Sequence, residues 1–455
     1  MEVSGNKERR SRWLYYCVGI LILLLYHMQY DLSYGDSVNF YGNVLKRGSE
    51  FFPVNGNVFE AIYNFTSFHY LNWSSRNVIE LILIIVGSLP VIFWHILDIL
   101  SVVLIAYSLD GLVHIKDWKK KYFCIFSFMM MYQVVTMRSA GWVATTINYS
   151  WVVAAGLYMF YIIQRIRKGE AVSKISYILA LVAAVFAFNQ EQLNGMFLLF
   201  MGMILINDFV KKSLKKTVLP FYLINIIEFF IIFFCPGNAN RKKVEVSAYF
   251  PIYEDYSLIH KVYEGICAML KALFDVRGMA IITMTGVVIL IYLSFKNKRA
   301  VYIKTIGIIC FIYQIAEFIY SIGLPAKLGI SVGILNSYRD NVPAAVVGIV
   351  VTAGIAVLGY ANIGKDEDKW IVLGALVSAA ATKLVLGFTV AFLVSGERTT
   401  IFLAVTIILI LLHFIEKYEE KISLLDQKWF QIVGIGANVL LFAWNYYSIC
   451  NGVII

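Results

Sequence analysis

The fold class can be read from residues 395–421, SGERTTIFLAVTIILILLHFIEKYEEK, where an apolar block at 399–415 lies between two short charged segments. Similar blocks recur along the whole chain of 455 residues, of which 60% are hydrophobic and 15% charged. A soluble globular chain has about 45–50% apolar and about 25% charged residues. The blocks and the mean hydropathy of +0.73 predict an all-α polytopic membrane protein. They exclude a water-soluble enzyme, a disordered chain and a repeat solenoid.

Apolar length predicts about 13 transmembrane helices, within a single integral-membrane domain that covers residues 1–455. The expected limits of these helices are 13–29, 90–109, 122–137, 150–163, 174–188, 193–207, 218–234, 278–295, 301–322, 342–362, 370–394, 399–415 and 429–447. Segment 78–89 stays open, because it could lie along the membrane interface before Pro90 or extend the second span. No cleavage site follows the basic head, so the first span is expected to remain in the protein.

The basic residues orient these spans. Most of the 39 Lys and Arg residues fall in the N-terminal head and in short loops on one side, such as KDWKKK, QRIRKGE and KKSLKK. The positive-inside rule makes that side cytoplasmic, so we expect the N-terminus inside and the C-terminus outside. This pattern also explains the net charge of +10, and no nucleic-acid partner is expected.

The other side then carries the long loops. The first extracytoplasmic loop covers residues 30–77, the fourth covers 235–277, and a further loop covers 323–341. Within the fourth loop, residues 257–275 have helical apolar spacing, with charged residues on the opposite face. We expect an interfacial helix there, on the outer surface.

Polar and charged side chains gather at the outer ends of the expected spans. Carboxylates and arginines beside apolar helices are costly unless they face a polar cavity or a partner, so we expect one outward-facing cavity. Arginine forks bind phosphate bidentately, a carboxylate can act as general base toward a hydroxyl, and aromatic rings suit sugar faces or the membrane interface. A sugar linked to a lipid phosphate fits this set. No metal ligand is assigned, although a divalent cation could bridge carboxylates and phosphate.

The candidate residues fall into three roles. The candidates for catalysis are Asp36, Asp31 and Glu191, with Asp36 preferred as general base and the choice between Asp31 and Asp36 left open. The candidates for holding the donor phosphate are Arg241, Arg339, Arg398, Arg138 and Arg76. The candidates for substrate binding are Trp142, Asn148, Tyr149, Gln190, Asn238 and Glu397.

Each role has a structural alternative. Asp36 could cap a short loop helix, and the arginines could be interfacial anchors or pair with loop acids. Lys383 lies inside a span, where it is either functional or extends its charge to the interface.

An ordered set of motifs resembles the GT-C superfamily of multi-span glycosyltransferases, and within it the bacterial integral-membrane enzymes that decorate surface polysaccharides. The motifs are YDLSYGD in the first loop, W-x-x-R at Trp73–Arg76, GWVATTINYSW, N-Q-E at Asn189–Glu191, P-G-N-x-x-R at Pro236–Arg241 and E-R at Glu397–Arg398. Relatives often carry two adjacent acids in the first loop, whereas here Ser37 follows Asp36.

The resemblance implies a multi-pass hexosyltransferase of the cell membrane, active in the cell envelope. It would move a sugar from a polyprenyl-phosphate donor to a hydroxyl of a surface glycan on the extracytoplasmic face. The implied partners are that donor, the glycan acceptor, membrane lipids, a donor-making synthase and a flippase. Two other classes stay open: a polysaccharide polymerase or ligase, and a lipid-linked-sugar flippase or transporter, which would favour midplane sites and internal repeats.

Overall fold

The computed structural model describes residues 2–33, 35, 58–275, 279–324, 338–363, 368–390 and 397–452. Every regular element in these ranges is a helix, which confirms the all-α prediction. Nine of the described helices are long and apolar enough to cross a membrane, and shorter apolar helices accompany them. Helices of this kind are compatible with a membrane protein. The number of 13 spans and their orientation remain predictions.

The described chain groups into two compact units. Unit 1 consists of Met1–Leu112 and Met137–Ile252, and unit 2 consists of Val113–Thr136 and Tyr253–Ile455. The 3-10 helices η1 (Val134–Arg138) and η4 (Pro251–Asp255) lie where the chain passes from one unit to the other. A single integral-membrane domain remains a prediction.

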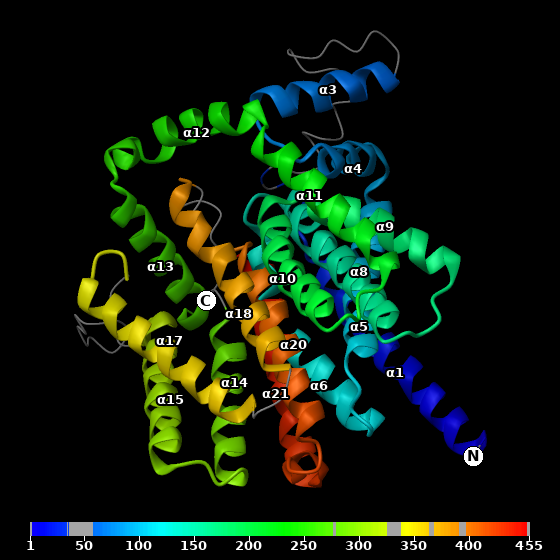
Figure 1. The fold of residues 1–455 in the computed structure, drawn as a ribbon, viewed down its shortest axis with the longest axis vertical. Coiled ribbons are helices and arrows are strands. Elements are labelled where there is room, and N and C mark those ends of the chain that lie inside the picture. Colours follow the sequence, from blue (N-terminus) through cyan, green and yellow to red (C-terminus); the bar gives the residue numbers. More distant parts are fainter. Residues whose placement is uncertain are drawn as a thin grey trace. The chain divides into compact units, whose positions relative to one another are not determined.

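Unit 1 is a set of helices that pack both on neighbours in the chain and on more distant helices. It contains α1 (Glu2–His27), α3 (Val58–Asn72), α4 (Asn77–Ser88), α5 (Val91–Leu112), α7 (Trp142–Thr145), the π-helical turn η2 (Thr146–Ser150), α8 (Trp151–Arg167), α9 (Lys174–Phe188), α10 (Glu191–Val210), η3 (Lys216–Val218), α11 (Leu219–Phe233) and α12 (Pro236–Tyr249). α8 packs against α5 and α9, and α11 packs against α9 and α10 (Figure 1). α3 packs against α12, so the first long loop meets the start of the fourth.

Unit 2 is also built of helices packed in contact. It contains α6 (Trp118–Met130), α13 (Leu258–Phe274), α14 (Ala280–Lys296), α15 (Val301–Ser321), α17 (Val342–Ile363), α18 (Asp368–Leu384), η5 (Val385–Phe388), α20 (Thr400–Lys417), η6 (Ser423–Asp426) and α21 (Lys428–Asn451). α14 packs against α15, α17 and α20, and α21 packs against α6. α13 packs against both α18 and η5.

Helix boundaries differ from the sequence-based limits where a polar residue starts or ends a helix. α6 begins at Trp118 rather than at residue 122, because Asp117 accepts a hydrogen bond from the backbone N–H of Lys119 and caps the helix inside the lysine-rich segment. Segment 78–89 forms its own helix, α4, which ends before Pro90. Segment 78–89 therefore does not extend the second span, and its position along the membrane interface remains a prediction.

A helix is present where one was expected at 257–275: it is α13, whose first turn is capped by the hydroxyl of Ser257. Its location at the membrane interface remains a prediction. α13 crosses the α18–η5 segment at two glycines. A Cβ atom on Gly265 would collide with the carbonyl oxygen of Leu384, and one on Gly387 would collide with the carbonyl oxygen of Lys261. Both positions therefore require glycine so that two backbones can approach.

We expect Gly265→Ala to lower the free energy of unfolding by about 1–3 kcal/mol, because the added methyl group forces the two backbones apart. Thermal unfolding of the purified protein in detergent measures the change. Gly436→Ala in α21 is the matched control, since a Cβ there meets nothing within 4 Å. Equal unfolding temperatures for the two variants would contradict the crossing.

Candidate functional site

The candidate site of unit 1 is built around the short link between α3 and α4, which ends at Arg76. α4 receives no side-chain cap from Arg76. Instead, the side-chain oxygen of Asn189, from the α9–α10 turn, accepts hydrogen bonds from the backbone N–H groups of Val78 and Ile79, at 3.0 and 3.2 Å. Two of the free donors at the start of α4 are satisfied in this way. The cap fixes the link that carries Arg76 against the α9–α10 turn.

Arg76 forms a two-point ion pair with Glu191. Its Nε and Nη2 each lie 2.7 Å from Glu191 Oε2, and its Nη1 donates to Asn148 Oδ1 at 2.9 Å. The ring of Tyr149 lies 5.8 Å from the guanidinium carbon. Only 15% of the Arg76 side chain and 25% of the Glu191 side chain are exposed. Burial alone would lower the pKa of Arg76, but the neighbouring Glu191 carboxylate, with Tyr149, raises it above the ordinary value, so Arg76 is charged.

Asn148 and Tyr149 reach Arg76 from a π-helical turn. The chain enters this region at Gly141, whose positive φ of 94° favours glycine. After one turn of α-helix, residues Thr146–Ser150 form the π turn η2. Such turns occur frequently at functional sites. Here the turn carries both residues that accompany Glu191 around the guanidinium group.

Arg241 adds a second positive charge near Glu191. It lies on α12, where its Nε donates to Glu245 Oε1 at 2.8 Å and its guanidinium carbon lies 5.7 Å from the ring centroid of Trp73. The positive charge of Arg241 acts electrostatically on the Glu191 carboxylate. The contact between α12 and the end of α3 is close: a Cβ on Gly237 would lie 2.5 Å from the backbone N of Trp73. This close approach explains the glycine of the P-G-N motif.

His69 lies beside the same arginine. Burial and then the positive charge of Arg241 lower the pKa of His69 to about 4. Its ring stacks on Phe65 with centroids 4.7 Å apart, and its Nδ1 lies 3.9 Å from Glu80 Oε1. His69 is therefore a neutral imidazole at physiological pH.

Asp31 and Arg138 form a separate pair in unit 1, with Nη2 and Oδ2 3.4 Å apart. Hydrogen bonds from Ser33 and then the Arg138 charge lower the pKa of Asp31. The neighbouring Tyr30 stacks on Trp142 with ring centroids 3.8 Å apart. Trp142 is fully buried, so it supports the start of the first loop.

Two further candidates make internal contacts. The buried side chain of Gln190 accepts from the backbone N–H of Leu193 at 2.7 Å and caps α10. The side-chain amide of Asn238 donates to the carbonyl of Ile232 at 2.9 Å, which closes the α11–α12 corner. Both therefore shape the turns that present Glu191 and Arg241.

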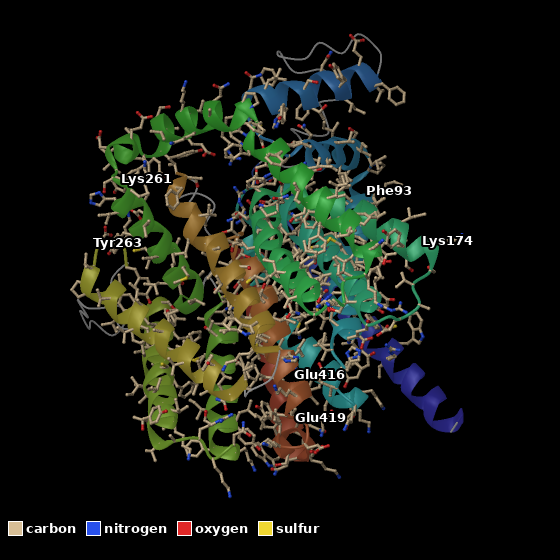
Figure 2. The ribbon with its side chains drawn as sticks, viewed as in Figure 1. Phe93, Lys174, Lys261, Tyr263, Glu416 and Glu419 are labelled. Carbon is tan, nitrogen blue, oxygen red and sulfur yellow. The ribbon has the colours of Figure 1, made fainter. Side chains whose placement is uncertain are left out.

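Unit 2 holds the remaining candidates in two places. Arg339 donates from Nε to Glu264 Oε1 at 2.8 Å, and Glu264 is 3% exposed. Glu264 lies on α13, as does Tyr263, whose hydroxyl donates to the carbonyl of Tyr338 at 2.7 Å (Figure 2).

The second place in unit 2 is the start of α20. The fully buried Lys383 donates from Nζ to Thr399 Oγ1 at 2.6 Å. Thr399 directly follows the candidates Glu397 and Arg398 in the chain. Lys383 lies inside unit 2 and does not extend its charge to the surface.

The structure thus brings Arg76, Asn148, Tyr149, Glu191 and Arg241 together, whereas Asp36 lies outside the described residues. One cavity shared by all candidates remains a prediction. Among the residues described, no group of three or more His, Cys, Asp or Glu side chains could hold a metal ion. The divalent cation stays a prediction.

Sequence reasoning assigned no role to Asn189 or to Glu228. The amide of Asn189 donates to Glu228 Oε2 at 3.2 Å, and Glu228 is 6% exposed. An acid within an apolar block needs a polar partner. Glu228 lies in such a block, so the sequence already indicated that it has one.

No protein-family model matches the chain, and neither the curated proteins nor the solved structures contain a match.

The Arg76–Glu191 pair should show strong coupling in a double-mutant cycle with Arg76→Gln and Glu191→Gln. We expect a coupling free energy of about 1–3 kcal/mol, because each single variant leaves a half-buried partner unsatisfied. The exposed pair Arg165–Glu170 is the control and should give less than about 1 kcal/mol. Chemical unfolding in micelles measures all variants, and equal coupling in the two pairs would contradict a buried site.

Acidification should destabilise the protein through His69. Its folded pKa of about 4 lies below the ordinary histidine value of 6.5, so only the unfolded state binds a proton between these values. The free energy of unfolding then falls by up to about 1.4 kcal/mol per pH unit as the pH drops from 6.5 toward 4. We expect His69→Gln to flatten this dependence in pH-resolved thermal unfolding. The variant His260→Gln is the control, and an unchanged slope in His69→Gln would refute the assignment.

Proposed function

We propose that the chain is an integral-membrane glycosyltransferase with GT-C-like architecture, about 13 spans, the N-terminus inside and the C-terminus outside. It moves a hexose from a polyprenyl-phosphate donor to a hydroxyl of a surface glycan, on the extracytoplasmic face of the cell membrane.

The supporting observation is the convergence of four motifs in unit 1. W-x-x-R supplies Arg76, GWVATTINYSW supplies Asn148 and Tyr149, N-Q-E supplies Glu191, and P-G-N-x-x-R supplies Arg241. The motifs are far apart in the sequence. Chance matches would have no physical reason to share one network of contacts.

The two arginines differ in how firmly they are held. Arg76 is bound by Glu191 through two nitrogens and by Asn148 through the third, so it is preorganised and provides a fixed positive charge. Within the described part of the chain, Arg241 forms an ion pair with Glu245 on its own helix. In the proposal, Arg241 turns from Glu245 to the donor phosphate, while Arg76 stabilises the negative charge that develops on the leaving phosphate.

The candidate carboxylates also differ in how readily they can accept a proton. Glu191 is held by Arg76, and hydrogen bonds from Ser33 lower the pKa of Asp31, so both are weak proton acceptors. We therefore assign the general base to Asp36. The acceptor hydroxyl gives its proton to Asp36, its oxygen forms the bond to the anomeric carbon, and the bond from that carbon to the phosphate oxygen breaks, leaving its electron pair on phosphate.

The test is hexose transfer by the protein in nanodiscs, from radiolabelled polyprenyl-phosphate hexoses to glycan from cells that lack the protein. We expect Asp36→Asn to lower the transfer rate by about 10²–10⁴-fold with donor binding unchanged. We expect Arg241→Gln to weaken donor binding about tenfold, which corresponds to the loss of one charge-assisted contact.

Arg165→Gln is the matched control, because Arg165 pairs with Glu170 outside the site. Full activity in Asp36→Asn, or equal donor binding in Arg241→Gln and Arg165→Gln, would overturn the assignment. Movement of donor between leaflets without acceptor, insensitive to Asp36→Asn, would identify a flippase instead.

A further inference from the structure

A second group of titratable side chains lies buried in unit 1 and belongs to none of the motifs above. It joins His27, the last residue of α1, to His95 and Asp98 on α5. His27 Nδ1 lies 2.7 Å from His95 Nδ1, and His27 Nε2 lies 3.1 Å from Asp98 Oδ2. Trp151 Nε1 donates to the other Asp98 oxygen at 2.7 Å. Ionisable groups buried among apolar helices are costly, and they are usually functional.

The hydrogen-bond chemistry allows two states of this group. His27 Nε2 faces Asp98 in an ion-pair contact that is not an aligned hydrogen bond. Because a carboxylate only accepts, the favourable arrangement places a hydrogen on this nitrogen. Between the two Nδ1 atoms one ring must donate and the other accept. Either His95 donates to a neutral His27, or a protonated His27 donates to a neutral His95.

The two states differ by one proton, and the structure indicates where it enters. His27 and Asp98 are 6% and 4% exposed, whereas His95 is partly exposed. A proton that binds His95 Nε2 lets the Nδ1–H bond of His95 break as an N–H bond forms on His27 Nδ1. The positive charge then lies on His27, beside the carboxylate of Asp98.

We propose that His27, His95 and Asp98 form a proton-binding relay, loaded through His95 and neutralised by Asp98. Phe93, labelled in Figure 2, lies two residues before His95 on α5 and marks the turn of the helix that carries His95. The relay goes beyond glycosyl transfer and does not depend on it.

The charge of the relay is presented to the first long loop. The ring of Tyr30 lies 4.6 Å from that of His27 and stacks on Trp142. Tyr30 directly precedes Asp31. A protonated imidazole interacts with an aromatic ring more strongly than a neutral one, so loading the relay strengthens the contact that anchors this loop.

Among the residues that the structure describes, the other titratable groups facing the relay are Tyr26 and Tyr30, from α1 and the residues after it. α8 contributes the neutral Trp151. The Asp31–Arg138 pair lies beyond Tyr30 and is internally neutral.

The test is nitrogen NMR of full-length protein labelled at histidine and held in nanodiscs. We expect a nitrogen–nitrogen coupling across the shared hydrogen bond, which is lost in both His27→Gln and His95→Gln. His260→Gln on α13 is the control and should retain the coupling. We also expect Asp98→Asn, which conserves size, to move the titration midpoint of the coupled pair, because an opposite charge is removed.

Two outcomes would overturn the relay. One is independent titration of the two rings without coupling. The other is an unchanged midpoint in Asp98→Asn. Asp98→Asn also provides a readout if a histidine variant fails to fold. No sugar substrate enters the measurement, so its failure leaves the proposed glycosyl transfer untouched, and failure of transfer leaves the relay untouched.

Discussion

A guanidinium group among apolar helices needs a carboxylate, and in unit 1 this requirement joins segments that are distant in the sequence. Arg76 lies before α4 and Glu191 begins α10, yet their charged atoms lie 2.7 Å apart. Breaking one side of such a pair leaves an uncompensated charge. The geometry of the site therefore depends on this pair, and the cap from Asn189, the π turn at Thr146–Ser150 and the close contact at Gly237 all serve to maintain it.

The same constraint recurs elsewhere with different partners. Asp98 is met by His27 and Trp151, and Arg339 is met by Glu264. Each charged group in these examples has a specific geometry rather than a general polar environment. Preorganised charge of this kind is suited to stabilising charge that develops in a reaction.

The sequence predicted the all-helical class, because apolar blocks between charged segments leave little choice of secondary structure. It did not predict α3 and α12, which lie within the expected long loops. It also named Arg76, Asn148 and Glu191 as members of one site, since each ends an apolar segment on the same predicted side. It could not identify the partner of each charge. An acid in an apolar block, such as Asp98 or Glu228, shows that a partner is needed, but tertiary packing selects that partner.

The first turn of α4 shows a similar limit. Capping motifs read from sequence are local. The cap of α4 comes instead from Asn189, which lies 111 and 110 positions after the two backbone donors, Val78 and Ile79.

This distant cap has a consequence for the order of assembly during synthesis. The ribosome completes the first long loop and α4 well before it makes the α9–α10 hairpin. Until that hairpin is in place, the leading amides of α4 have no side-chain acceptor and Arg76 has no counter-charge. We therefore expect Arg76 and the start of α4 to reach their final packing only after α9 and α10 have inserted. Until then, water or a chaperone must satisfy these polar groups.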